Sequence, residues 1–247
     1  IPDYRGPTGT ARRHAPMTYQ TFTGSAPARR RYWARSYLGW RQLAAARPNA
    51  GHRAVAMLQE HGLVDGIITQ NVDGLHQAAG ASGVIELHGG LDRVVCLDCG
   101  ARSSRRALDA RLRAANVEFT AVARVNPDGD ADLSDADLDG FVSVGCAACG
   151  SDLLKPDIVF FGESVPRPRV DACFALVAAA ASLLVLGSSL TVMSGLRFVR
   201  RAAALDIPIV IVNQGETRGD ALARCKIEAP LGATLTGLVE CYLPTSA

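Results

Sequence analysis

"SLLVLGSSLTVMSGLRFVRRAAALDIPIVIVN", residues 182–213, is the stretch of sequence that decides the fold. Its two ends, 182–187 and 208–213, are short apolar runs without polar alternation, which is typical of strands buried on both faces. Between them, Leu196, Val199 and Ala203 recur at helical spacing. A strand, a helix and a second strand in this order predict a βαβ unit of a parallel sheet.

The same alternation of helices and strands extends upstream. A helix is predicted to begin after Asn49 and to end at Gly62, because asparagine caps helix starts and glycine favours helix ends. Further strands are expected at 64–69, 84–88 and 157–162. This order predicts an α/β fold with a doubly wound, Rossmann-like parallel sheet, in which ligands bind beyond the carboxyl ends of the strands.

The net charge and the apolar runs exclude some classes of binding partner. The 247 residues are 48% hydrophobic and carry a net charge of +2, which gives no electrostatic footprint for nucleic acid. The longest apolar run is interrupted by Ser182 and is too short to cross a bilayer. We therefore expect no nucleic-acid and no membrane partner, while the sequence leaves the oligomeric state open.

The seven cysteines divide into two pairs and three isolated residues. An odd number in a large chain favours a reducing compartment. We therefore expect a cytoplasmic protein, or a mitochondrial matrix protein if a targeting segment was removed. The isolated Cys173, Cys225 and Cys241 stand in apolar or helical segments and are predicted to be buried thiols.

Two Cys-x-x-Cys-Gly knuckles predict a metal site. Two such turns complete the tetrahedral four-thiolate shell of a structural zinc ion, and the ligands would be Cys96, Cys99, Cys146 and Cys149. A closed shell of this kind leaves no open position for a substrate and none for the nearby His88.

The knuckles also predict the domain organisation. Residues 93–154 are expected to form a small zinc-binding domain, because the 46 residues 100–145 must fold out between the knuckles as an insert. Its acidic part has the aspartate spacing of a calcium loop, but Leu133 stands where that loop needs glycine, so a solvated loop is expected. Residues 1–92 and 155–247 are expected to form the Rossmann-like domain, with a helical insert near 10–49.

Polar residues lie at or just beyond the carboxyl ends of four of the predicted strands. They are Gln70, Asn71 and Asp73, then His88, then Gly187, Ser188 and Ser189, and finally Asn213, Gln214 and Gly215. Amide and carboxylate groups complement the carboxamide of nicotinamide, and a small, donor-rich turn suits a phosphate or a ribose. Four such strand ends together favour a ligand of dinucleotide size.

The ordered motifs "IPDYR", "TQNVDGLH", "ELHG", the two knuckles, "LKPDIVFFGE", "LGSSL" and "IVN" resemble the sirtuin family of NAD-dependent protein-lysine deacylases. The resemblance covers nearly the whole chain. The motifs "RYWAR", "DRVVCLDCG" and "PDGD", together with the long insert, are similar to those of the class II branch of that family.

The resemblance implies NAD as co-substrate, one structural zinc ion and acylated-lysine proteins or peptides as substrates. It implies that His88 is the general base, that Gln70 and His88 contact the nicotinamide ribose, and that Asn71 and Asp73 line the nicotinamide pocket. A mobile cofactor loop would hold Asp3, Tyr4 and Arg5, with Ile1 beside the nicotinamide.

The other implied contacts concern ADP-ribose and the peptide. The ADP-ribose half would be held by Gly187, Ser188, Ser189, Asn213, Gln214 and Gly215, with Leu231 near the adenine. The acyl-lysine peptide would pair as an added strand with Val159, Phe160, Phe161 and Gly162.

In the implied reaction the acyl-amide oxygen attacks the anomeric carbon as nicotinamide leaves, and His88 then takes a proton from a ribose hydroxyl. A histidine suits this role because its ordinary pKa lies near working pH. The products would be lysine, nicotinamide and an O-acyl-ADP-ribose. Two other functions stay open: mono-ADP-ribosyl transfer to proteins, and a zinc-stabilised sensor of NAD or ADP-ribose without turnover.

Two features bear on how the chain would handle its ligands. The Gly-Ala-Gly-x-Ser turn that precedes "IPDYR" in the family is absent, so the sequence as given is expected to bind NAD weakly or to be shortened. Tyr32 and Arg35 have a Tyr-x-x-Arg spacing that reads acidic acyl chains in desuccinylating sirtuins. The hypothesis is that they select an acidic acyl group here.

Overall fold

The computed structural model describes residues 16–119, 133, 138 and 140–243. They fall into two compact units. We call the described parts of Arg47–His88 and Val165–Ala247 the sheet unit, and those of Ile1–Ala46 and Gly89–Ser164 the cysteine unit. Within these described ranges, no helix has both the length and the apolar character needed to cross a membrane.

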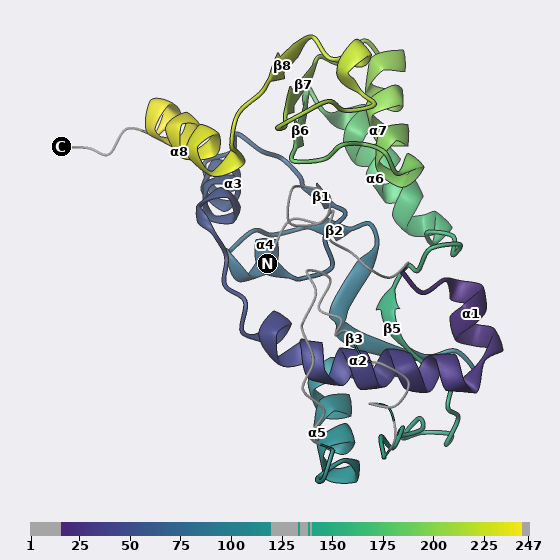
Figure 1. Ribbon diagram of the computed structural model, residues 1–247. Coiled ribbons are helices and arrows are strands. Elements are labelled where there is room, and N and C mark those ends of the chain that lie inside the picture. Colours follow the sequence, from purple (N-terminus) through teal and green to yellow (C-terminus); the bar gives the residue numbers. More distant parts are fainter. Residues whose placement is uncertain (1–15, 120–132, 134–137, 139, 244–247) are drawn as a thin grey trace. The chain divides into compact units, whose positions relative to one another are not determined.

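The sheet unit contains a parallel three-stranded sheet. β6 (Leu183–Leu186) pairs with β7 (Ile209–Val212), and β7 pairs with β8 (Cys225–Ile227). Helix α7 (Met193–Ala204) connects β6 to β7, and Figure 1 shows the two strands next to each other. The βαβ unit predicted from residues 182–213 is therefore confirmed.

Helices cover both faces of this sheet, because successive side chains of a strand point to opposite faces. Val185 packs in one core with α6 (Arg167–Ala179) and α7. The next residue, Leu186, packs against a second core between α3 (Ala50–Glu60) and α8 (Leu231–Tyr242), which lie side by side in Figure 1. Each fully buried Leu or Ile here contributes about 1.5–3 kcal/mol relative to exposure. This is a doubly wound arrangement.

A second parallel pair in the sheet unit is short. β1 (Ile68–Thr69) pairs with β2 (Ile85–Glu86), and α4 (Leu75–Ala78) lies between them in the sequence. The preceding α3 begins as predicted, since the Asn49 side chain accepts a hydrogen bond from the His52 amide. Gly62 follows its end with a φ of +71°, a conformation that glycine adopts readily.

The cysteine unit is built on an antiparallel sheet. β3 (Gly89–Cys96) pairs on one side with β4 (Arg102–Ser104) and on the other with β5 (Leu154–Ile158). The start of β3 requires glycine, because a Cβ on Gly89 would lie 1.9 Å from the main-chain oxygen of Asp157. α5 (Arg105–Ala115) packs Leu108 and Leu112 into the same core.

Two further helices belong to the cysteine unit. α1 (Tyr19–Gly24) is capped by Thr18, and α2 (Ala26–Ala44) is capped by Ser25. Trp33 of α2 is buried, and its indole N–H donates to the main-chain oxygen of Leu154, 2.9 Å away. This bond fixes α2 to β5.

Three expectations differ from the structure. Residues 157–162 do not form one strand: β5 ends at Ile158, and beyond it only Phe161 makes an isolated bridge, to Thr18. Cys173 is buried as predicted, but Cys225 and Cys241 are exposed. The side chains of Cys225 and Ile227 lie on the same face of β8, and this face is exposed.

The two compact units do not follow the predicted domain boundaries residue by residue. The described residues 16–46 group with the cysteine knuckles, whereas the prediction joins them to the Rossmann-like domain as part of a helical insert near 10–49. The two units are defined by compactness, whereas the predicted domains are defined by fold type. The predicted boundaries therefore stay a prediction.

Candidate active site

His88 follows the buried Leu87 at the end of β2, and its ring is held at both nitrogens. Nδ1 lies 3.1 Å from the main-chain oxygen of Gln70, and Nε2 lies 2.9 Å from Oγ of Ser194. A carbonyl oxygen can only accept, so Nδ1 carries the hydrogen and Nε2 accepts from the Ser194 hydroxyl. The basic lone pair of His88 is therefore on Nε2.

The surroundings of His88 keep the ring neutral. Desolvation by burial is the main cause that lowers the pKa of His88 below its ordinary value of 6.5, and Arg169 and Arg197 lower it further. The hydrogen bond to the Gln70 carbonyl opposes this shift. At pH 7 the ring is therefore unprotonated and able to accept a proton.

Gln70 links His88 to the loop after β6. Its Oε1 accepts a hydrogen bond from the Ser188 hydroxyl at 3.1 Å. A Cβ on Gly195 would lie 2.9 Å from either terminal atom of the Gln70 side chain, so a larger residue there would displace this side chain from its present position. The structure thus brings together Gln70, His88 and Ser188, three of the predicted residues.

Asn71 and Asp73 lie in the turn between β1 and α4. The Asn71 amide donates to the Thr69 hydroxyl at 3.1 Å, and Asp73 Oδ1 accepts from the Leu75 amide at 2.9 Å. Asp73 therefore also fixes the start of α4. Contact of these two side chains with nicotinamide stays a prediction.

The loop after β6 is compact. Gly187 has a φ of +59°, and a Cβ there would lie 2.5 Å from Cδ1 of Leu231. Leu231, predicted to lie near the adenine, is therefore packed directly on this loop. The Ser188 hydroxyl also accepts from the Leu190 amide, and the Ser189 hydroxyl pairs with that of Thr191.

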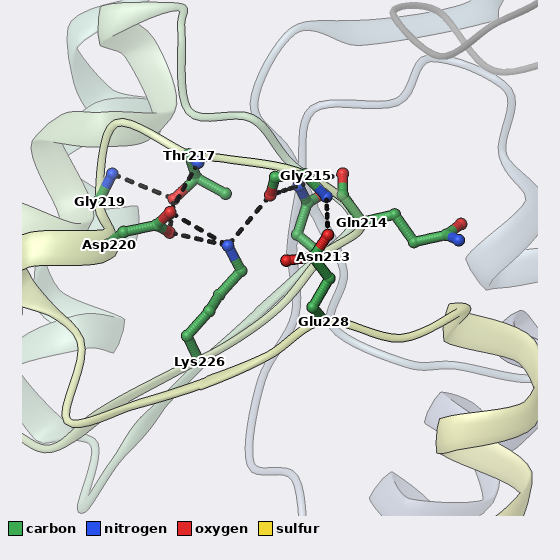
Figure 2. A network of polar contacts seen from close by, with 8 residues as sticks. All are labelled: Asn213, Gln214, Gly215, Thr217, Gly219, Asp220, Lys226 and Glu228. Atoms are coloured by element: carbon green, nitrogen blue, oxygen red, sulfur yellow. Dashed lines mark hydrogen bonds and ion pairs between the residues drawn. The ribbon is translucent and has the colours of Figure 1, made fainter.

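The loop after β7 is held by a polar network (Figure 2). The Asn213 carboxamide donates to the main-chain oxygens of Gln214 and Gly215, at 2.8 and 3.0 Å. Lys226 Nζ donates to the same Gly215 oxygen at 3.0 Å and forms an ion pair with Asp220 at 3.1 Å. Bonds from Thr217 are the main cause that lowers the pKa of Asp220, which keeps its carboxylate ionised.

Arg218 connects the loops that follow β6 and β7. Its amide donates to the main-chain oxygen of Ser189 at 3.0 Å, and its guanidinium donates to that of Thr191 at 2.8 Å. The next residue is closely packed, since a Cβ on Gly219 would lie 2.5 Å from Cδ1 of Leu190 and would displace that side chain. The two predicted ADP-ribose loops are therefore one connected structure.

The predicted peptide segment, Val159 to Gly162, lies in the cysteine unit and is already partly hydrogen-bonded. The Phe160 amide donates to Glu163 Oε2 at 2.8 Å, and the Glu163 amide returns a bond to the Phe160 oxygen at 3.0 Å. The Tyr19 amide donates to the Phe161 oxygen at 2.9 Å, and the Gln20 side chain to the Gly162 oxygen at 3.0 Å. A peptide strand would have to pair with other main-chain groups of this segment.

The two knuckles have matching geometry. Gly100 and Gly150 have φ values of +72° and +79°, and each donates its amide, at 2.9 Å, to the main-chain oxygen of the first cysteine of its knuckle. Amides of Cys149 and Ala148 are the main cause that lowers the pKa of the Cys146 thiol. The Ser151 amide also lowers the pKa of Cys149, but the neighbouring cysteine sulfurs and burial raise it overall, so the adjacent thiols share their protons.

The four sulfurs fit a zinc ion. All lie within 4.8 Å of one another, with Cys96 to Cys149 at 3.7 Å and Cys99 to Cys146 at 3.8 Å. Tetrahedral zinc with Zn–S bonds of about 2.3 Å requires sulfurs about 3.8 Å apart. The predicted ligand set is thus assembled, and His88 is not part of it.

Four predicted cofactor residues, Ile1, Asp3, Tyr4 and Arg5, lie outside the described residues. Their roles stay predictions from the resemblance.

Comparison with known proteins identifies the family. Residues 1–194 match the Sir2 family. The chain belongs to the Sir2 family. The sirtuin membership that the sequence motifs predict is thereby confirmed, whereas its class II character stays a prediction.

Curated Sir2 relatives are similar over nearly the whole chain. NAD-dependent protein deacetylase 1 of Streptomyces coelicolor is 62% identical over 241 residues, which cover 97% of this chain and 80% of that protein. NAD-dependent protein deacetylase 1 of Mycobacterium avium is 50% identical over 244 residues, covering 97% and 86% of the two chains.

Solved Sir2 structures share the fold. A Sir2 complex with a p53 peptide and NAD+ superposes with a TM-score of 0.75 at 29% identity, covering 97% of this chain and 86% of that one. A Sir2 protein bound to acetylated peptide gives a TM-score of 0.73 at 28% identity, covering 90% and 81%. The predicted Rossmann-like α/β fold with a zinc-binding module is therefore confirmed.

Three residues of this Sir2 chain escaped the sequence prediction: Ser194, Arg218 and Lys226. Each acts on a predicted residue through a contact distant in sequence, Ser194 lying 106 positions from His88. One available signal was Lys226, one of only two lysines in an arginine-rich chain. Another was the Ser194-Gly195 pair: two small residues at the start of a predicted helix allow neighbouring side chains to lie close to the helix.

Proposed function

We propose that this Sir2 protein is an NAD-dependent protein-lysine deacylase, which produces lysine, nicotinamide and O-acyl-ADP-ribose. The observation that carries the proposal is the neutral His88 at the carboxyl end of a parallel strand, with its lone pair on Nε2 and with Gln70 and Ser188 beside it. The relatives named as NAD-dependent protein deacetylases support the same activity.

His88 acts as the general base. When bound, NAD supplies the ribose carbon that exchanges nicotinamide for the acyl oxygen, and a ribose hydroxyl that gives up its proton. Nε2 of His88 takes that proton, and the Nδ1–H bond to the Gln70 oxygen stabilises the cation that forms, since it favours the charged ring. A positioned base of this kind accelerates a step by about 10²–10⁴-fold.

The other predicted residues bind and orient the co-substrate. Gln70, oriented by Ser188, holds the nicotinamide ribose, and Asn71 and Asp73 hold the nicotinamide carboxamide. The ADP-ribose half is held by the loops after β6 and β7, through Gly187, Ser188, Ser189, Asn213, Gln214 and Gly215, with Leu231 beside them. Ile1, Asp3, Tyr4 and Arg5 are proposed to complete the site.

The acylated lysine is presented by a protein or peptide substrate. Val159, Phe160, Phe161 and Gly162 are proposed to receive it by strand addition. The exposure of Phe161, 45%, supports this, since a partner can reach it. Tyr32 packs against Phe160 with ring centres 5.4 Å apart, so an effect of Tyr32 and Arg35 on acyl choice is proposed as well.

The zinc ion has a structural role in this proposal. Four cysteine ligands close its coordination shell, so it stabilises the fold of the knuckles and takes no part in the reaction. Thiolate ligands require reducing conditions, and the curated relatives come from bacteria, so we propose a cytoplasmic location. The domain division at residues 93–154 is proposed with it.

Product identification tests the proposal. The protein is incubated with NAD and an acetyl-lysine peptide, and the small molecules and the protein are analysed by mass spectrometry. We expect O-acetyl-ADP-ribose and deacetylated peptide in equal amounts. ADP-ribose attached to protein would instead indicate a mono-ADP-ribosyltransferase, and NAD binding without nicotinamide release would indicate a sensor.

The acyl group is tested with a panel of acetyl-, glutaryl- and lipoyl-lysine peptides. If Arg35 pairs with an acidic acyl chain, Arg35→Ala lowers the glutaryl rate and leaves the acetyl rate unchanged. An unchanged glutaryl rate in this variant rejects the acyl-selection hypothesis and leaves the deacylase proposal standing.

A further inference from the structure

Ser194 occupies the nitrogen of His88 that must take the proton. Its hydroxyl lies 2.9 Å from Nε2, whereas Nδ1 is engaged by the Gln70 carbonyl. Ser194 is 8% exposed, so the contact is shielded from competing water. Neither the sequence motifs nor the names of the relatives assign a role to this serine.

The position of Ser194 is determined by the start of α7. Ser194 is the second residue of that helix and Gly195 the third. Because Gly195 has no Cβ, the helix lies close to the Gln70 side chain, whose terminal atoms would have to move if a Cβ were present. The same close approach brings the Ser194 hydroxyl to the ring of His88.

A hydroxyl suits both protonation states of the ring. It donates to the single lone pair of Nε2 while His88 is neutral. When the ribose hydroxyl delivers its proton, the Ser194 hydrogen turns away and frees that lone pair, and the Ser194 oxygen then accepts from Nε2–H of the charged ring. An alanine can do neither, and a buried ring nitrogen without a partner costs free energy. With this hydroxyl the His88 ring is held at both nitrogens through proton transfer, whereas without it only the Nδ1 bond to the Gln70 oxygen orients the ring.

We propose that Ser194 is a positioning residue for the general base: its hydroxyl holds the His88 ring, with the lone pair on Nε2, in the orientation that receives the ribose proton. The proposal rests on the deacylase function and concerns one step of it. Nicotinamide departs before His88 acts, so Ser194 affects the later step and not the earlier one.

Two rates measured side by side test this. Exchange of labelled nicotinamide into NAD, in the presence of acetyl-lysine peptide, reports the step before proton removal, and peptide deacetylation reports the complete reaction. In Ser194→Ala we expect deacetylation to fall by about tenfold relative to exchange, the effect of one lost buried hydrogen bond. Ser194→Thr retains a hydroxyl and is expected to restore most of the deacetylation rate.

A spectroscopic measurement tests the contact without any activity. In ¹⁵N spectra of histidine-labelled protein, the Nε2 resonance of His88 is expected to shift in Ser194→Ala and to return in Ser194→Thr, while Nδ1 keeps its bond to Gln70. Thr236→Ala, which removes a hydroxyl bonded only within α8 to the Gly232 oxygen, is the matched control and changes neither readout.

Three results would overturn the proposal. They are deacetylation by Ser194→Ala at the wild-type rate, an equal fall of exchange and deacetylation, and an unmoved Nε2 resonance. Failure of the deacylase function itself is distinguishable, because the wild-type protein would then be inactive while the ¹⁵N result would still report on the Ser194 contact.

Discussion

His88 shows what a single residue can and cannot reveal through sequence. The sequence placed His88 at the end of a predicted strand, and the resemblance to sirtuins implied that it is the general base. The closed four-cysteine shell excluded it as a zinc ligand. Its hydrogen-bond partners could not be predicted in the same way. The contact with Ser194 depends on how closely α7 approaches β1, which is a property of packing.

The pH dependence of activity follows from the lowered pKa of His88. Burial lowers this pKa below 6.5, so the ring stays neutral, and active as a base, at pH values where an exposed histidine is already charged. We expect kcat/KM for deacetylation to be constant near pH 7 and to fall on acidification with a midpoint below 6.5. A midpoint above 6.5 would contradict the assigned surroundings of His88.

At the scale of elements, the short strands place the site and the loops after them form it. Apolar runs predicted β6, β7 and the helix between them well, because burial on both faces leaves a clear pattern. The strand expected at 157–162 was wrong beyond Ile158. There the buried Lys155 pairs with Glu163 at 3.0 Å, and Glu163 accepts a hydrogen bond from the Phe160 amide, which forms a turn. The apolar residues of this segment predict a strand and give no sign of this turn.

Lys226 gives a prediction at this scale, because it holds the loop after β7 without being one of the proposed contacts to NAD. In Lys226→Met the Gly215 oxygen and Asp220 lose their shared cation. We expect KM for NAD to rise by about five- to tenfold while kcat changes by less than about twofold, as for a loss of binding alone. Initial-rate kinetics with varied NAD measure both.

Lys226→Arg is the matched control, since it keeps a cation and several donors at the same place. It is expected to recover part of the affinity for NAD. A fall in kcat at unchanged KM for NAD in Lys226→Met would contradict a role of the Lys226 contacts in cofactor binding.

At the scale of the whole molecule, the chain forms two units with separate cores. The sequence predicted an α/β part and a cysteine module, because their apolar and cysteine patterns differ. It did not predict that residues 16–46 group with the knuckles, since α2 is fixed there by long-range contacts such as the Trp33 bond to Leu154. Such contacts leave no periodic signal.

Zinc removal is expected to affect the cysteine unit most. Cys96 and Cys146 are buried in the core that also holds Leu108 and Leu154, so metal loss would leave unpaired thiols inside it. We expect one zinc per chain by elemental analysis, and a lower melting temperature after treatment with a chelator.

Two cysteine variants distinguish the loss of a zinc ligand from the loss of a cysteine that binds no metal. Cys149→Ser removes one exposed ligand and is expected to lose zinc and stability, whereas Cys241→Ser, at an exposed cysteine outside the cluster, is expected to change neither. Full zinc content and an unchanged melting temperature in Cys149→Ser would contradict the four-thiolate site.

The most direct test of the central claim is the rate of NAD-dependent deacetylation of an acetyl-lysine peptide by the wild-type protein and by His88→Ala. The account predicts deacetylated peptide and O-acetyl-ADP-ribose with the wild type, and a rate at least about 100-fold lower with the variant, the usual contribution of a general base. Deacetylation by His88→Ala at the wild-type rate would contradict the assignment of His88 as the base.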